Sequence, residues 1–135
     1  MTMPLMSHVS LGTNDLPRAL AFYDAVLGAI GGRRIVEQPG VTVAYGRQAP
    51  EFWVTRPIDG GEAKAANGVH FAFMVANEDE VRAFYEAALK AGARPDGEPG
   101  PRSDYTAAYY GCFLRDPDGH KIEAHSWDES KAASA

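Results

Sequence analysis

The sequence repeats itself at a fixed offset. A shift of 62 residues (70 − 8 = 62) places His8 on His70. The same shift matches further residues in order and without a gap: residues 21–25 with 83–87, Leu27 with Leu89, and Ala29 with Ala91. Self-similarity at a fixed period indicates two copies of one supersecondary unit. The sequence therefore predicts two consecutive modules of similar structure.

Each half begins with a predicted strand, residues 8–11 and residues 70–75, in which apolar residues recur at strand spacing. An amphipathic helix follows in each half, because apolar residues then recur at intervals of three and four. The predicted N-caps of these helices are Asp15 and Asn77, and the predicted stop signals are Gly28 and Gly92. The buried faces of both helices are expected to include Phe22, Tyr23, Phe84 and Tyr85.

Extended segments are expected after each helix: residues 33–37, 41–45 and 52–55 in the first half, and 109–115 and 121–127 in the second. Residues 116–119 predict a tight turn, residues 60–68 a linker and residues 95–101 a loop. The fold class is therefore α+β, with two βαβββ modules in tandem. Residues 1–129 are expected to form one domain, with modules at about 5–60 and 68–128, followed by a frayed tail at 130–135.

Charge and composition exclude several classes of partner. Thirteen basic and eighteen acidic residues give a formal charge of 13 − 18 = −5, which argues against nucleic acid and anionic membranes as partners. No apolar stretch approaches the roughly 18–20 residues of a membrane span, and the N-terminal residues lack the features of a signal peptide. A single cysteine, Cys112, suits a reducing compartment and is expected to be a small core residue. We expect a soluble cytoplasmic protein.

Three residues form a candidate metal site. His8 and His70 occupy equivalent places in the repeat, and Glu123 lies on the last predicted strand. Two histidines and one carboxylate are a recognised ligand set for divalent metals with open positions. The alternatives are a partly exposed histidine at a strand start and a carboxylate on the polar face of an edge strand. His125 shares the face of Glu123 and is a further candidate ligand or supporting partner, whereas His120 is expected to be solvent-exposed.

An aromatic segment precedes the strand at 109–115. Arg102, Tyr105 and Tyr109 are candidates for a substrate-binding wall with one anion anchor, and Trp53 is a candidate from the first half. The alternative for Tyr109 and Tyr110 is that both are ordinary strand residues, one on each face.

Two motifs carry a resemblance to a known family. They read Asp15-Leu16-x-x-Ala19-x-x-Phe22-Tyr23-x-x-Val26-Leu27-Gly28 and Asp116-Pro117-Asp118-Gly119-His120-Lys121-Ile122-Glu123. Together with His8 and His70, they resemble the vicinal oxygen chelate superfamily, which includes glyoxalase I, extradiol dioxygenases, and the fosfomycin and bleomycin resistance proteins. The resemblance implies paired modules around a metal-centred cleft, with His8, His70 and Glu123 as ligands, and a homodimer.

The same resemblance marks a departure from glyoxalase I. That enzyme has a further glutamate at the position that Trp53 occupies when residues 52–54 are matched to residues 122–124, and Glu51 is a weak substitute. Glyoxalase I activity itself is therefore not expected.

The first hypothesis is a metal-dependent lyase or dioxygenase that binds Fe²⁺, Mn²⁺, Zn²⁺ or Ni²⁺ and chelates vicinal oxygens of a small-molecule substrate. In it, Glu123 acts in catalysis, Tyr105 or His125 transfers a proton and Arg102 holds an anion. The alternative is a metal-free protein that sequesters an aromatic or cationic molecule, as in bleomycin resistance.

Overall fold

The structure, a computed structural model, describes residues 2–102 and 104–132. The first module contains β1 (Val9–Gly12), α1 (Leu16–Gly28), β2 (Arg33–Gln38), β3 (Thr42–Gly46) and β4 (Phe52–Thr55). The second module contains β5 (His70–Met74), α2 (Glu78–Lys90), β6 (Arg94–Pro95), β7 (Gly100–Pro101), β8 (Tyr109–Arg115) and β9 (Lys121–Trp127), and α3 (Glu129–Ala132) follows it.

The helices confirm the predicted repeat. Adding 62 to the bounds of α1, residues 16 and 28, gives 78 and 90, which are the bounds of α2. The caps are also equivalent, because the Asp15 carboxylate accepts from the third amide after it at 3.1 Å and the Asn77 side chain does the same at 2.9 Å. The same local signals therefore start the same helix in both halves.

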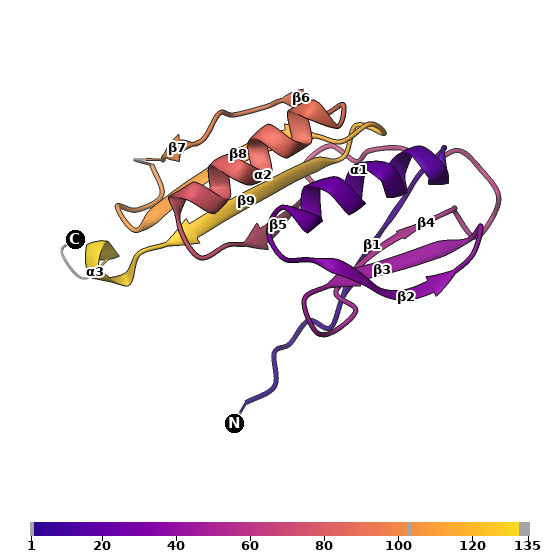
Figure 1. The fold of residues 1–135 in the computed structure, drawn as a ribbon, viewed down its shortest axis with the longest axis horizontal. Helices are drawn as coiled ribbons and strands as arrows, with labels where there is room; N and C mark the ends of the chain where they lie inside the picture. Colours follow the sequence, from indigo (N-terminus) through magenta and orange to yellow (C-terminus); the bar gives the residue numbers. More distant parts are fainter. Residues whose placement is uncertain (1, 103, 133–135) are drawn as a thin grey trace.

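The two sheets have matching topologies. The first has the strand order β1-β4-β3-β2, and the second has the order β5-β9-β8-β6, with β7 also paired to β8. In each sheet the first strand of the module pairs in parallel with its last long strand, and the remaining pairs are antiparallel. α1 and α2 contact each other between the modules (Figure 1). The predicted α+β class with two βαβββ modules is confirmed.

Strand register shows which residues are equivalent. Ser10 lies opposite Trp53 on β4, and Ala72 lies opposite Glu123 on β9. Because 10 + 62 = 72, Trp53 occupies in the first sheet the place that Glu123 occupies in the second. The alignment of these two residues is confirmed.

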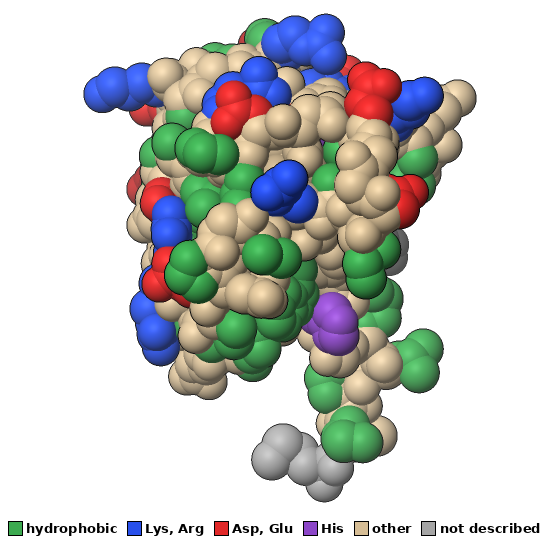
Figure 2. Space-filling view, turned by 90° about the vertical axis from the view of Figure 1, so that its right-hand side faces the viewer, with side chains coloured by type: hydrophobic (Ala, Val, Ile, Leu, Met, Phe, Trp, Pro, Cys, Tyr) green, Lys and Arg blue, Asp and Glu red, His purple; other side chains and the backbone are tan. Residues whose placement is uncertain are grey.

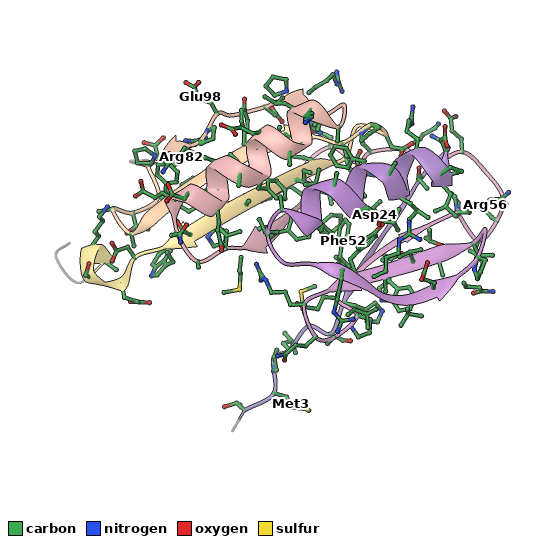
Figure 3. The ribbon with its side chains drawn as sticks, in the orientation of Figure 1. Met3, Asp24, Phe52, Arg56, Arg82 and Glu98 are labelled. Atoms are coloured by element: carbon green, nitrogen blue, oxygen red, sulfur yellow. The ribbon has the colours of Figure 1, made fainter. Side chains whose placement is uncertain are left out.

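One hydrophobic core serves both modules. The Phe52 ring contacts Tyr23 and Phe73 with centroids 5.0 Å apart in both pairs, and Phe73 packs on Phe84 at 5.7 Å. Figure 3 shows Phe52 beneath α1. Phe22, Tyr23 and Phe84 are buried and Tyr85 packs against the core, as predicted. Cys112 is fully buried, and burial raises the pKa of its thiol to about 11, which suits an inert core residue.

Three segments differ from the sequence prediction. The segment 95–101 was expected to be a loop. It contains Pro95 of β6 and the whole of β7, because its backbone pairs with the edge of β8. Residues 130–132 belong to the short helix α3, where a frayed tail was predicted, and residues 133–135 lie outside the described part of the chain. His120 was expected in solvent but is partly buried, with its Nε2 2.7 Å from the Gly12 carbonyl.

The turn at 116–119, between β8 and β9, contacts the first module. The Gly119 amide donates to the Asp116 carbonyl at 2.8 Å, which confirms the predicted turn. The buried Asp116 carboxylate accepts from the Tyr23 hydroxyl of α1 at 2.6 Å and from two amides of its own turn. Desolvation, followed by the charge of Asp116, raises the pKa of Tyr23 well above its ordinary value. A polar link therefore crosses the shared core.

Replacing Tyr23 with phenylalanine is expected to destabilise the fold by about 1.5–3 kcal/mol, because a buried carboxylate loses its donor. Urea unfolding at pH 7 measures this change. Tyr45→Phe is the matched control. The Tyr45 hydroxyl donates to Asp24 at 2.8 Å, and Asp24 also pairs with Arg34 near solvent. Because Asp24 keeps that partner, loss of the Tyr45 hydroxyl is expected to destabilise the fold less. Equal losses in the two variants would contradict the role given to Asp116.

Among the described residues, no helix is long and apolar enough to cross a membrane.

Candidate functional site

A histidine and a glutamate meet on the open face of the second sheet, which is the face that α2 does not cover. Glu123 of β9 lies between Ile122 and Ala124, which point into the core, so its own side chain points away from α2. Its Oε1 lies 3.0 Å from Nε2 of His70 on the adjacent strand. Glu123 is only 6% exposed, whereas the His70 side chain is 46% exposed. The pair therefore combines a buried carboxylate with an imidazole that a ligand can reach.

Tyr109 supplies the second contact of this carboxylate. Its hydroxyl donates to Oε2 of Glu123 at 2.7 Å, and both residues are buried. Desolvation, followed by the hydrogen bond to Glu123, raises the pKa of Tyr109 above its ordinary value. Tyr110 points to the opposite face, where its hydroxyl accepts from Arg82 at 2.9 Å. The predicted alternation of the two tyrosines is confirmed, and Tyr109 is the one on the face of Glu123.

An aromatic stack extends this face. The Tyr109 ring is stacked on His125 with centroids 5.5 Å apart and planes inclined at 18°. The Tyr105 ring meets the Tyr109 ring edge-on, with centroids 4.9 Å apart, and Tyr105 remains 59% exposed. Nδ1 of His125 is buried and has no hydrogen-bond partner among the described residues. A bound molecule with a complementary polar group would satisfy it.

The first module contributes His8 and Trp53. β1 begins at Val9, so His8 lies one residue before the strand in which it was predicted. Its ring lies 6.1 Å from that of Trp53, edge to face. The indole Nε1 of Trp53 is buried without a partner among the described residues. Each module therefore has a histidine at or just before its first strand and a buried polar atom without a partner among the described residues.

His8 and the His70–Glu123 pair are only partly brought together within one chain. His8 and His70 both line a groove of about 390 Å³ where the modules meet, and Glu51 also lines it. Glu123 is not part of that lining. Across residues 2–102 and 104–132, no three histidine, cysteine or acidic side chains lie close enough to hold a metal ion.

Arg102, predicted to hold an anion, is hydrogen-bonded within its own loop. Its guanidinium donates to the backbone carbonyls of Glu98, Gly100 and Pro101, and it lies 5.7 Å from the centre of the Phe113 ring. These bonds hold its own loop in place. Of these contacts, Phe113 is the one that also lies next to His70.

Two neighbours of the pair were missed by the sequence prediction. The Phe113 ring lies 5.9 Å from that of His70, and the ammonium of Lys121 lies 4.9 Å from the Phe113 ring centre. Lys121 and Phe113 face the same side as Glu123, since Lys121 precedes it by two residues and Phe113 lies opposite it in register. The two-residue period of these strands was the signal that could have found them.

The donor pair fits a divalent metal. Two ligands that are each about 2.1 Å from an ion and at right angles to each other lie about 3.0 Å apart. Nε2 of His70 and Oε1 of Glu123 lie 3.0 Å apart, close to this separation and equally the length of a hydrogen bond between them. Imidazole and carboxylate together suit Fe²⁺, Mn²⁺, Zn²⁺ and Ni²⁺.

The family follows from comparison with known proteins. The model of the Glyoxalase/Bleomycin resistance protein/Dioxygenase superfamily matches residues 5–124, and the chain belongs to this superfamily. It is 31% identical to a lactoylglutathione lyase of Haemophilus influenzae over 86% of this chain and 87% of that protein. It is 28% identical to the metallothiol transferase FosB of Shouchella clausii over 90% of this chain and 79% of that protein.

Solved structures agree with this assignment. A glyoxalase/bleomycin resistance protein from Albidiferax ferrireducens superimposes with a TM-score of 0.82 at 34% identity, covering 93% of this chain and all of that one. The fosfomycin resistance protein FosX of Listeria monocytogenes has the same fold, with a TM-score of 0.68 at 17% identity over 97% of this chain and 99% of that one. The resemblance and the fold predicted from the motifs are therefore confirmed.

Proposed function

We propose that this protein is a divalent-metal-dependent enzyme in which His70, Glu123 and His8 hold the ion. The observation that carries the proposal is the contact of 3.0 Å between the buried Glu123 carboxylate and the accessible His70 imidazole. Burial of a carboxylate is costly unless its oxygens have partners, and here the two partners are a potential metal ligand and a hydroxyl. When bound, the ion would act as a Lewis acid toward substrate oxygens.

The third ligand is proposed to come from a second copy of the chain. His8 forms no three-residue metal cluster with the His70–Glu123 pair among the described residues, and the chain exposes large apolar residues on its N-terminal arm, before β5 and at the ends of β5 and β9. They are Met3, Leu5, Met6, Val69, Met74 and Trp127. Figure 2 shows hydrophobic side chains on the projecting N-terminal arm and beside it. A homodimer that places the first module of one chain on the second module of the other would cover them and complete the site.

The surrounding side chains suit binding and proton transfer. Tyr105 is exposed next to Tyr109 and is the proposed proton donor, while the His125 ring that stacks on Tyr109 is proposed to contact the substrate. Trp53 would cover the substrate from the other module. The charges of Arg102 and Lys121, both close to the Phe113 ring, would attract an anionic group.

The reaction is proposed to be that of a lyase or a dioxygenase acting on a small molecule with vicinal oxygens. Relatives named lactoylglutathione lyase and metallothiol transferase support an enzyme of this superfamily. Trp53 stands where a fourth ligand, a second carboxylate, would lie, so efficient glyoxalase I activity is not expected from this chain. A cytoplasmic location is part of the proposal, because its single cysteine is a buried free thiol.

Metal content tests the proposal directly. Protein purified without chelator is expected to contain about one transition ion per chain by elemental analysis, since each ligand set serves one ion. Protein that stays empty after incubation with Fe²⁺, Mn²⁺, Zn²⁺ and Ni²⁺ would contradict the enzyme proposal.

A metal-free binding protein is the second candidate. The adjoining rings of Tyr105, Tyr109 and His125 favour it, because they form an aromatic cluster on an acidic protein. His8→Ala separates the two candidates: it is expected to prevent metal uptake under the first and to leave the binding of aromatic cations intact under the second.

A further inference from the structure

We propose that Tyr109, seated over Gly111, is a positioning residue that holds Glu123 as a single-oxygen ligand beside His70. The inference rests on the proposed metal function and concerns how the carboxylate is presented. Metal affinity and coordination then depend on Tyr109 as well as on the ligands themselves.

The tyrosine crosses one row of residues on this face of the sheet to reach the carboxylate. On β8 and β9, Tyr109 lies opposite Trp127, Gly111 opposite His125, and Phe113 opposite Glu123. The Tyr109 hydroxyl nevertheless donates to Glu123 at 2.7 Å. Its ring therefore passes over the row of Gly111 and His125, and the stacking on His125 at 5.5 Å is consistent with this path.

Gly111 leaves the space for this path. A Cβ at position 111 would overlap the Tyr109 hydroxyl and lie 2.5 Å from Cζ of the same ring. The glycine does not have a positive φ, so backbone conformation does not require it here. Close approach of the tyrosine is the reason that a side chain does not fit.

The consequence for Glu123 is that its two oxygens have separate roles. Oε2 accepts from Tyr109, and Oε1 lies next to Nε2 of His70. A carboxylate held in this way presents one oxygen to a metal, as small transition ions accept, rather than the two oxygens that large, highly coordinated ions such as Ca²⁺ commonly take.

The test is metal binding by Tyr109→Phe and Gly111→Ala, with Tyr110→Phe as the matched control on the opposite face. Tyr109→Phe is expected to bind Zn²⁺ about 10–100-fold more weakly in direct titration, the usual effect of losing a partner of a metal ligand. Gly111→Ala is expected to reproduce this loss because it displaces the ring. Tyr110→Phe is expected to match the wild type.

Spectroscopy of the Co²⁺-loaded proteins distinguishes positioning from a general structural role. The visible spectrum reports coordination, so it is expected to change in Tyr109→Phe and Gly111→Ala but not in Tyr110→Phe. Unchanged Zn²⁺ affinity and Co²⁺ spectrum in Tyr109→Phe would overturn this inference and leave the metal site intact. A wild-type protein that binds neither ion would overturn the proposed function and this inference together.

Discussion

Replacement of Glu123 with glutamine is expected to weaken transition-metal binding by more than about 100-fold, because loss of a ligand costs more than loss of its outer partner. Glutamine has nearly the same shape, and its amide oxygen can still accept from Tyr109. The buried position therefore remains filled while its charge is lost. Elemental analysis and direct Zn²⁺ titration measure the effect, and thermal unfolding of the metal-free protein checks that the fold is retained.

Glu51→Gln is the control for this experiment. Glu51 is an exposed carboxylate that lines the groove shared by His8 and His70. It lies two residues before Trp53 and is the other acidic residue close to the proposed site in the first module. Metal binding that survives in Glu123→Gln but is lost in Glu51→Gln would place the site in the groove and contradict the assignment of Glu123.

Mixing two inactive variants is expected to restore metal binding if the site lies between chains. In a twofold dimer, one site uses His8 of the first chain with His70 and Glu123 of the second, and the other site uses the reverse set. A heterodimer of His8→Ala and His70→Ala therefore keeps one intact site of two. Heterodimers isolated with two different tags are expected to hold about half the wild-type metal, while each variant alone holds none.

The matched control is a heterodimer of His70→Ala and Glu123→Gln. Both changes lie in the second module, so each of the two sites contains one of them and no binding is expected. If the sites were formed within each chain, neither heterodimer would bind metal. The pattern of restoration thus identifies which chain supplies His8.

Local signals in the sequence predicted most of the fold. The caps Asp15 and Asn77 and the turn at 116–119 are local signals, each formed by a few neighbouring residues. The offset of 62 residues shows that the same local pattern occurs twice. Alternation along β8 and β9 likewise put Tyr109 and Tyr110 on opposite faces. The match of Trp53 to Glu123, made by aligning residues 52–54 with residues 122–124, agrees with the observed strand register.

These local signals could not predict contacts between segments that are distant in the sequence. The prediction for His120 was wrong because its partner, the Gly12 carbonyl, belongs to the other module. The loop at 95–101 gains strand structure only because β8 offers an unpaired edge. Neither partner can be found from residues that are close in sequence.

The sequence by itself determined the two-module plan and the choice of His8, His70 and Glu123 as candidate ligands. Repeats, caps and periodicity are properties of nearby residues, and they persist in any arrangement of the modules. The tertiary structure alone decided that Glu123 is buried against His70 and Tyr109, and that His8 shares a groove with His70 without forming a three-ligand cluster among the described residues. Such contacts depend on how strands and modules pack across the whole chain, which a local pattern does not specify.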